Sequence, residues 1–300
     1  MNVINMLRMK NRWLGVVLPS VVAKQNAKMF LSPRRYPLKA WEQEAEQQGM
    51  RVSFAKGLSA IRWGQSEKRI LLMHGWEGRA TQMYGLAKPL VEQGYEVIAI
   101  DGPKHGHSKG DKANPVEFAN AIVDASTAFG PFYGAIGHSM GGCALAMAFE
   151  KGADLGRYAL VSSPACVHDV LKGFASFMGL NSDISQRFIN EIEATVGRAA
   201  KDLDVGRMMA KHSDEKLLIH STDDLEVPYH SMIQIRDQLS NVRSFSPEGL
   251  GHRKIMRDNS IIDIISTFMS EKQTMEMRVT PWPQGFPLGD YHRGLFSFKP

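Results

Sequence analysis

Residues Gly137–His138–Ser139–Met140–Gly141 are the stretch that decides the fold. A serine with glycines two positions before and after it fits a tight strand-to-helix turn, because the backbone folds back so closely there that only small residues leave room. The apolar run 133–136 precedes the turn, and the alanine-rich segment 142–148 follows it as a predicted helix. The turn would lift the Ser139 hydroxyl clear of the sheet as a nucleophile. The alternative is a structural serine in a tight turn.

Similar short apolar runs recur along the chain, at 70–73, 97–100, 158–161, 217–219 and, more weakly, 242–245. Segments with helical periodicity alternate with them, at 80–93, 115–128, 140–151, 230–239 and 258–270. This alternation predicts an α/β domain with a mostly parallel central sheet and helices on both faces. The carboxyl ends of the strands would share one edge, where such sheets place their sites. Before them, residues 51–63 alternate with period two around Gly57, which predicts a hairpin.

Three segments flank or interrupt this main domain, which we predict to span residues 49–270. Residues 1–48 are predicted to form a helical extension. Residues 165–213 are helix-like and too long for one crossover, which favours a small helical cap inserted over the carboxyl edge; the alternative is extra crossover helices packed beside the sheet. Residues 271–300 are rich in proline and aromatic side chains and are predicted to form an irregular tail.

A serine hydroxyl needs a base to take its proton. We predict His252 as that base, because it follows a glycine in a short loop between the last strand and the last helix; the alternative is a histidine in a flexible turn. The acid that orients it is predicted to be Asp224, whose register places Pro228 at the start of the next helix. Asp223 is the alternative, and Asp169 a more distant one.

The developing oxyanion also needs hydrogen-bond donors. The backbone N–H of Met140, at the start of the helix, is one candidate. The backbone N–H of Trp76, in the loop 74–78 after the first apolar strand, is the other, because Gly75 allows a close approach of the chain. The Trp76 side chain would wall the acyl pocket or serve only in packing.

These motifs, taken together and in order, resemble the α/β-hydrolase family. They are His74–Gly75–Trp76, Asp101–Gly102–Pro103–Lys104–His105–Gly106–His107–Ser108, the Ser139 turn, Asp224–Leu225–Glu226–Val227–Pro228 and Gly251–His252. The likeness covers about residues 50–270 and is strongest to the esterase and lipase-like branch. It implies the α/β-hydrolase fold, a Ser-His-Asp triad, a covalent acyl-enzyme and no cofactor. Lys104 departs from the pattern, since glycine is common there.

The predicted function is therefore that of a carboxylesterase-like serine hydrolase, acting through Ser139 on a small-molecule ester of short to medium acyl chain. The same triad would serve a thioesterase, a C–C bond hydrolase, a peptidase or a perhydrolase. Dehalogenases and epoxide hydrolases are disfavoured because they resemble the chain with aspartate in place of Ser139. An alternative of another class is a non-catalytic binding protein on this fold.

Composition argues against several other classes. The net charge of +5 is modest, and no basic run is interleaved with aromatic residues, so we predict no nucleic-acid binding. Cys143 and Cys166 lack the spacing of metal ligands and fit small buried residues of a reducing compartment. His105 and His107 form a His-x-His pair, but the resemblance gives this loop a structural explanation, and we predict no metal site.

The N-terminus is basic over residues 1–12 and apolar over 13–23, a run too short to span a bilayer. We predict a helix packed on the main domain and a cytoplasmic location. The alternatives are export through a cleaved signal ending at residues 21–23, and a helix lying at a membrane interface. Membrane association is the less favoured of these expectations, and the sequence leaves the oligomeric state open.

Overall fold

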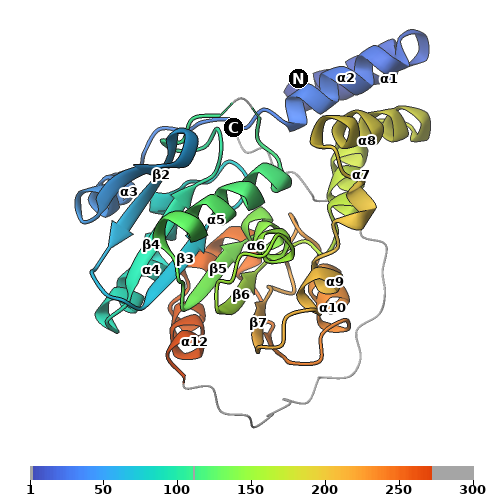
Figure 1. The fold of residues 1–300 in the computed structure, drawn as a ribbon. Coiled ribbons are helices and arrows are strands. Elements are labelled where there is room, and N and C mark those ends of the chain that lie inside the picture. Colours follow the sequence, from blue (N-terminus) through green and yellow to red (C-terminus); the bar gives the residue numbers. More distant parts are fainter. Residues whose placement is uncertain (1–2, 111, 272–300) are drawn as a thin grey trace.

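An eight-stranded sheet forms the centre of the computed structural model, which describes residues 3–110 and 112–271 (Figure 1). The strand order is β1-β2-β4-β3-β5-β6-β7-β8, and every neighbouring pair is parallel except the two that involve β2. The strands are β1 Met50–Phe54, β2 Leu58–Trp63, β3 Arg69–Met73, β4 Glu96–Asp101, β5 Gly134–His138, β6 Arg157–Val161, β7 Lys216–Ile219 and β8 Val242–Phe245. The predicted mostly parallel sheet, with its antiparallel hairpin at one edge, is confirmed.

Helices cover both faces of the sheet, which explains why the central strands are apolar throughout. In β3, Leu71 and Met73 belong to one buried cluster, while Ile70 and Leu72 belong to a second cluster on the opposite face. Successive side chains of a strand point to opposite faces, so one apolar run contributes to both cores. The first cluster contains residues of α5 and α6, and the second contains residues of α4 and α12. These helices are α4 Tyr84–Glu92, α5 Pro115–Phe129, α6 Met140–Glu150 and α12 Asn259–Ser270.

The segment between β6 and β7 is helical, and a second group of helices precedes β1. Between β6 and β7 lie α7 Val167–Phe177, α8 Ser182–Val196 and α9 Val205–Met209. Before β1 lie α1 Val3–Val17, α2 Pro19–Phe30 and α3 Ala40–Gln47. Helix α2 packs along α8, so that residues far apart in sequence lie side by side beyond the main helical layers (Figure 1). The predicted tail lies, from residue 272 onward, outside the described residues.

Two further helices follow β7 and β8 in the C-terminal part of the main domain. Helix α10 runs over His230–Arg236, and the short helix α11 Gly251–Lys254 carries the predicted base. In the described part of the chain, no helix combines the length and the apolar character that crossing a bilayer requires.

Candidate active site

Ser139 stands between the end of β5 and the start of α6 with a strained backbone. Its φ of 54° and ψ of −122° lie in a region that side chains rarely adopt. The turn is tight enough that a Cβ on Gly141 would lie 2.3 Å from the carbonyl oxygen of Met73 and 2.7 Å from that of His74. The glycine is therefore required by the close passage of the β3 end, and the turn presents the Ser139 side chain at the carboxyl edge of the sheet.

Gly141→Ala is expected to destabilise the protein by about 3 kcal/mol or more, because both obstructing atoms belong to the backbone and cannot rotate away. Gly85→Ala is the matched control: the nearest atom to its added Cβ is 3.7 Å away, and the residue lies in the helix α4. That change should stabilise the protein by about 0.5–1 kcal/mol through helix propensity. Urea unfolding measures both, and equal stability of the two variants would contradict this account of the turn.

The structure brings Ser139, His252 and Asp224 into one hydrogen-bonded chain. The Nε2 atom of His252 is 3.0 Å from the Ser139 Oγ, and its Nδ1 atom is 2.7 Å from Oδ2 of Asp224. The carboxylate accepts a hydrogen bond from the Nδ1–H group, which leaves Nε2 as the acceptor for the serine hydroxyl. These are the three residues that the sequence predicted as nucleophile, base and acid.

Asp224 is buried and surrounded by donors. Its Oδ1 accepts the backbone N–H groups of Glu226 and Val227, at 2.8 and 2.9 Å, and Nε2 of His220 lies 3.3 Å from its Oδ2. Burial alone would raise the pKa of Asp224, but the hydrogen bonds from His220 and His252 outweigh it and hold this pKa well below its usual range. The carboxyl group is therefore an anion facing the imidazole.

Asp223 has a different task. Its Oδ1 accepts the backbone N–H of Gly249 at 3.0 Å and that of Gly251 at 3.2 Å, in the loop that precedes His252. The hydrogen bond from the Ser221 hydroxyl lowers the pKa of Asp223. Asp223 thus ties down the histidine loop, while its neighbour contacts the ring.

The two backbone amides predicted as oxyanion donors belong to Met140, which directly follows Ser139, and to Trp76 in the loop after β3. Met140 is the first residue of α6, where N–H groups have no partner within the helix and the helix dipole favours negative charge. The Trp76 N–H makes no hydrogen bond within the described residues. The loop that carries it passes close to the nucleophile, because a Cβ on Gly75 would lie 3.0 Å from the Ser139 Cβ. The two residues predicted as oxyanion donors therefore lie on the two segments that meet at the nucleophile's turn.

Two buried histidines fix the position of the Trp76 loop. His74 donates from Nδ1 to the Gly75 carbonyl at 2.7 Å and accepts the Gly102 N–H at Nε2, 2.9 Å away. His105 accepts the Glu77 N–H at 3.1 Å. Burial lowers the pKa of His74 to about 4 and that of His105 to about 3, so both rings are neutral near pH 7. His74 and His105 thus hold the loop after β3 and the loop after β4 together.

The remaining sequence candidates lie away from this chain of hydrogen bonds. Asp169 is in the first turn of α7, and the His252 ring is paired with Asp224 instead. Lys104 adopts a φ of 65°, so the lysine takes the left-handed conformation for which the family favours glycine. Among the described residues, no group of three His, Cys, Asp or Glu side chains could hold a metal ion.

Sequence reasoning missed two histidines that support the triad. His138 donates from Nε2 to the backbone carbonyl of His252 at 2.9 Å, and thereby holds the base's loop against the turn. The residue is partly exposed, but desolvation of its ring by the surrounding protein lowers the pKa of His138 to about 3. His220 is buried between the Val227 carbonyl, 2.9 Å from Nε2, and Asp224. The available signal was position: His138 is the last residue of β5 and His220 directly follows β7, and both strands lead into a loop of the site.

The Trp76 side chain packs against the N-terminal extension. Its ring stacks on Phe30, the last residue of α2, with centroids 6.0 Å apart, and Phe30 also contacts Phe174 of α7 and Phe188 of α8. Next to it, Glu77 forms a bidentate ion pair with Arg34, with both N–O distances at 2.9 Å. Aromatic side chains from three separate segments therefore meet beside the proposed oxyanion loop.

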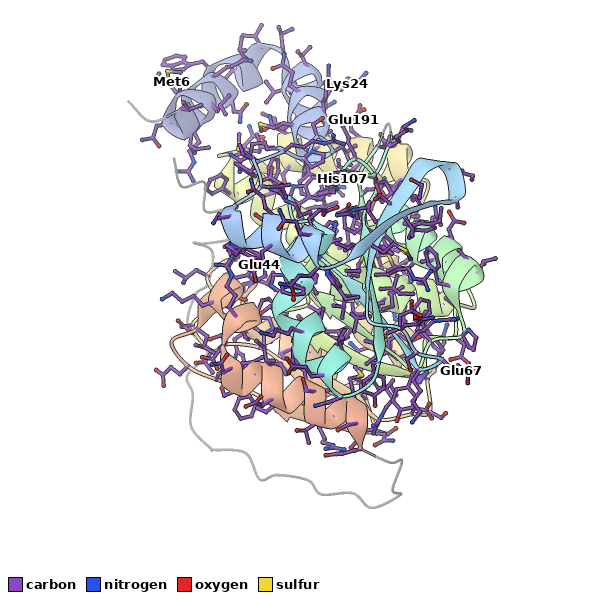
Figure 2. The ribbon with its side chains drawn as sticks, turned by 90° about the vertical axis from the view of Figure 1, so that its left-hand side faces the viewer. Met6, Lys24, Glu44, Glu67, His107 and Glu191 are labelled. Carbon is purple, nitrogen blue, oxygen red and sulfur yellow. The ribbon has the colours of Figure 1, made fainter. Side chains whose placement is uncertain are left out.

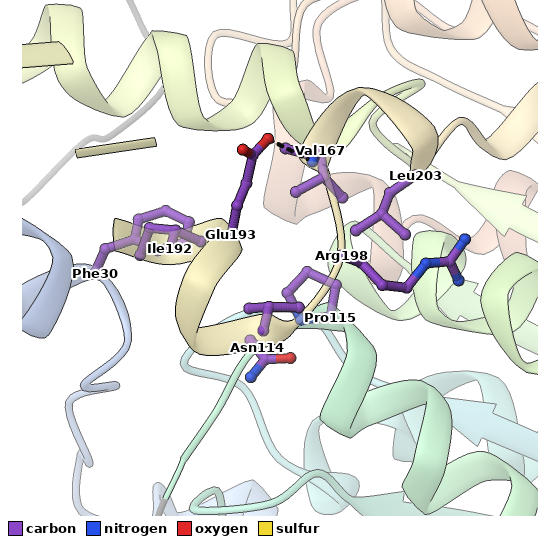
Figure 3. Close-up of a pocket in the computed structure, with 10 residues that line it drawn as sticks. Phe30, Asn114, Pro115, Val167, Ile192, Glu193, Arg198 and Leu203 are labelled. Carbon is purple, nitrogen blue, oxygen red and sulfur yellow. Dashed lines mark hydrogen bonds between the residues drawn. The ribbon is translucent and has the colours of Figure 1, made fainter. Parts of the chain in front are cut away.

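Two small cavities lie near this aromatic cluster. One, of about 10 Å³, is mainly apolar, with Phe30 and Ile192 on one side and Val167 and Leu203 on the other (Figure 3). A second, of about 80 Å³, is lined by polar groups that include Arg34, Glu77 and His105. Ser139 lines neither cavity.

Comparison with known families finds one match. Residues 64–231, more than half of the chain, match the hydrolase family that is described as serine aminopeptidase, S33. None of the curated proteins compared with the chain matches it.

Solved structures share the architecture at low sequence identity. An esterase from Pyrococcus furiosus is 16% identical, with a TM-score of 0.61, covering 80% of this chain and 97% of its own. An esterase from Exiguobacterium antarcticum is 15% identical, with a TM-score of 0.56 and coverages of 74% and 100%. A putative lipase from Acinetobacter baumannii is 17% identical, with a TM-score of 0.58 and coverages of 78% and 97%. These likenesses confirm the α/β-hydrolase fold.

Proposed function

Because this chain belongs to the serine aminopeptidase S33 family of α/β-hydrolases, we propose that it is a serine hydrolase that cleaves carboxylic esters through an acyl-enzyme on Ser139. The observation that carries the proposal is the Ser139–His252–Asp224 chain, with hydrogen-bond distances of 3.0 and 2.7 Å. A non-catalytic binding protein would have no need of a serine held in a strained turn beside a histidine that is paired with a carboxylate.

This geometry supports the following proposed reaction. His252 Nε2 takes the Ser139 proton as Oγ forms a bond to the ester carbonyl carbon, and the carbonyl oxygen becomes an oxyanion bound by the N–H groups of Trp76 and Met140. Asp224 stabilises the imidazolium that forms. His252 then gives the proton to the departing alkoxide as the C–O bond breaks. A water molecule, deprotonated by His252, then attacks the acyl carbon. The bond from that carbon to the Ser139 Oγ breaks as His252 returns the proton to Oγ, and the acid is released.

Charges beside the site favour ester over aminopeptidase activity. An aminopeptidase must bind the substrate's free ammonium group, for which a carboxylate is the natural partner. On the two loops that carry Trp76 and Asp224, the carboxylates of Glu77 and Glu226 are each held by an arginine: Arg34 at 2.9 Å and Arg253 at 2.7 Å. An uncharged acyl group needs no such partner, and the nearby phenylalanine cluster suits it.

We expect the enzyme to hydrolyse p-nitrophenyl acetate, butyrate and octanoate, with kcat/KM for palmitate at least about tenfold lower. The physical reason is the packing beside the Trp76 loop: Phe30 stacks on Trp76 and packs against the buried core, so a long chain fits there only if these side chains move. The measurement is a steady-state series with these esters, with leucine p-nitroanilide for aminopeptidase activity and an acyl-coenzyme A for thioesterase activity.

Each class of substrate in this series distinguishes the proposed esterase activity from one alternative activity. Turnover of the anilide above that of every ester would replace the proposal by aminopeptidase activity, and turnover of the thioester alone would replace it by thioesterase activity. A folded protein that hydrolyses none of these compounds would count against simple acyl transfer altogether. The octanoate and palmitate results together test the acyl-length expectation.

A further inference from the structure

Exposed apolar side chains are concentrated at one end of the molecule. Of the twelve large apolar residues with exposed side chains in the described part of the chain, eight lie between residues 3 and 21. The most exposed are Val16 at 81%, Val17 at 75% and Trp13 at 73%. They belong to α1 and the turn into α2, a two-helix hairpin (residues 3–30) that stands at the outer end of the molecule (Figures 1 and 2). An apolar patch on this scale marks an interaction surface.

The exposed side of α1 is distinct from its packing side. Asn11 and Gly15 are buried; Asn11 donates to the Met178 carbonyl at 2.9 Å, and a Cβ on Gly15 would lie 2.5 Å from Ile184 of α8. At 100° per residue, Met9, Trp13 and Val16 fall on the opposite side of the helix. The fold of this chain therefore uses one face of α1 and leaves the other, apolar face to solvent.

The charged side chains of the hairpin itself all have the same sign. Residues 1–41 contain eight Lys and Arg side chains and no Asp or Glu, whereas the other 259 residues contain 28 basic and 31 acidic side chains. Among these eight, Arg8, Lys10 and Arg12 lie on α1, and Lys24 and Lys28 lie on α2. Lys24 pairs with Glu191 of α8 at 3.9 Å, and Figure 2 shows these two side by side and Met6 farther out on α1. The hairpin is thus a cationic amphipathic element on a slightly acidic body.

We propose that this hairpin docks the protein on an anionic lipid bilayer. Apolar side chains with a tryptophan among them insert at the headgroup boundary, while flanking basic residues meet the anionic surface, and these are the two features that interfacial helices combine. A second copy of this chain fits the face less well, because pairing two hairpins would bring two sets of like charges together. The interfacial role that the sequence left as a minor alternative is favoured by the exposure of α1.

The hairpin is also connected to the catalytic loops. Phe30 ends α2 and stacks on Trp76, and Arg34 pairs with Glu77, so docking fixes the bilayer on the side of the molecule where α2 and α8 pack together. An ester dissolved in the bilayer would reach the site from that surface. The docking itself does not depend on the chemistry of Ser139.

The test is co-sedimentation of the full chain with vesicles of phosphatidylcholine alone, and with one third phosphatidylserine. We expect binding to the anionic vesicles only, weakened by salt, and the same binding for Ser139→Ala. Lys10→Glu/Arg12→Glu/Lys28→Glu should weaken it at least about 100-fold, since each cation near an anionic surface contributes about fivefold. Trp13→Ser/Val16→Ser/Val17→Ser should weaken it more than about tenfold.

Matched controls change the same chemistry elsewhere. Lys88→Glu/Lys151→Glu/Lys201→Glu reverses three exposed cations, and Met50→Ser removes an exposed apolar side chain; both should bind as wild type does. Hydrolysis of a soluble ester by every hairpin variant shows that it is folded. Equal binding to both vesicle types, or no binding, would overturn the proposal. So would a wild-type dimer, seen by sedimentation equilibrium, that the Trp13 triple variant dissociates.

Discussion

Ser139→Ala is expected to lower kcat for p-nitrophenyl butyrate by about 10⁴-fold or more, leaving only the rate that binding and the oxyanion donors supply. The substitution removes the one oxygen that His252 faces at 3.0 Å. The conformational strain of the backbone at residue 139 stays the same, because alanine, like serine, has a Cβ at the φ of 54°. The variant should therefore fold as wild type does and fail only in chemistry.

Ser162→Ala is a closely matched control. Ser162 is also buried at the carboxyl end of a strand and has a φ of 50°, but its hydroxyl has no hydrogen-bond partner among the described residues. We expect this variant to keep kcat within about twofold, since no role in the reaction is lost. A fluorophosphonate probe followed by mass spectrometry should label residue 139 in the wild type and in Ser162→Ala. Labelling of another residue, or wild-type turnover by Ser139→Ala, would remove Ser139 as nucleophile.

Local patterns were enough to predict the sheet and the three central residues. Each buried strand of the parallel part is a short apolar run. The two glycines around Ser139 reflect close backbone contacts: Gly137 with the start of α6, and Gly141 with the end of β3. The order of these elements places their carboxyl ends together, so Ser139, Asp224 and His252 could be expected to meet. This succeeds because the sheet converts sequence order into position.

Contacts between distant segments could not be predicted in the same way. Nothing in the sequence near Phe30 shows that it stacks on Trp76, or that Arg34 pairs with Glu77, because both contacts depend on how α2 packs against α8. The tight turn at Asp223 and Asp224 also leaves two carboxylates within reach of one loop. The register to Pro228 favoured Asp224 as the acid, but only the side-chain directions show that Asp223 instead holds Gly249 and Gly251.

The two neighbouring carboxylates supply the second large effect: Asp224→Asn should lower kcat by about 10⁴-fold, while Asp223→Asn should lower it less than about tenfold. In Asp224→Asn the amide can donate to Nδ1 of His252, which moves the proton to Nε2 and leaves no acceptor for the Ser139 hydroxyl. It also removes the charge that stabilises the imidazolium. Both losses act at the 2.7 Å contact between the ring and Oδ2.

Asn at 223 keeps an oxygen that accepts the Gly249 and Gly251 N–H groups at the distances of 3.0 and 3.2 Å. The loop should therefore stay in place. The charge that Asp223→Asn removes faces Gly249 and Gly251 and not the ring of His252. Pre-steady-state release of p-nitrophenol checks both variants, because the acylation step itself needs the base. A larger loss for Asp223→Asn would mean that this carboxylate, and not Asp224, orients His252 in the working enzyme. Equal losses would show instead that holding the loop matters as much as holding the proton.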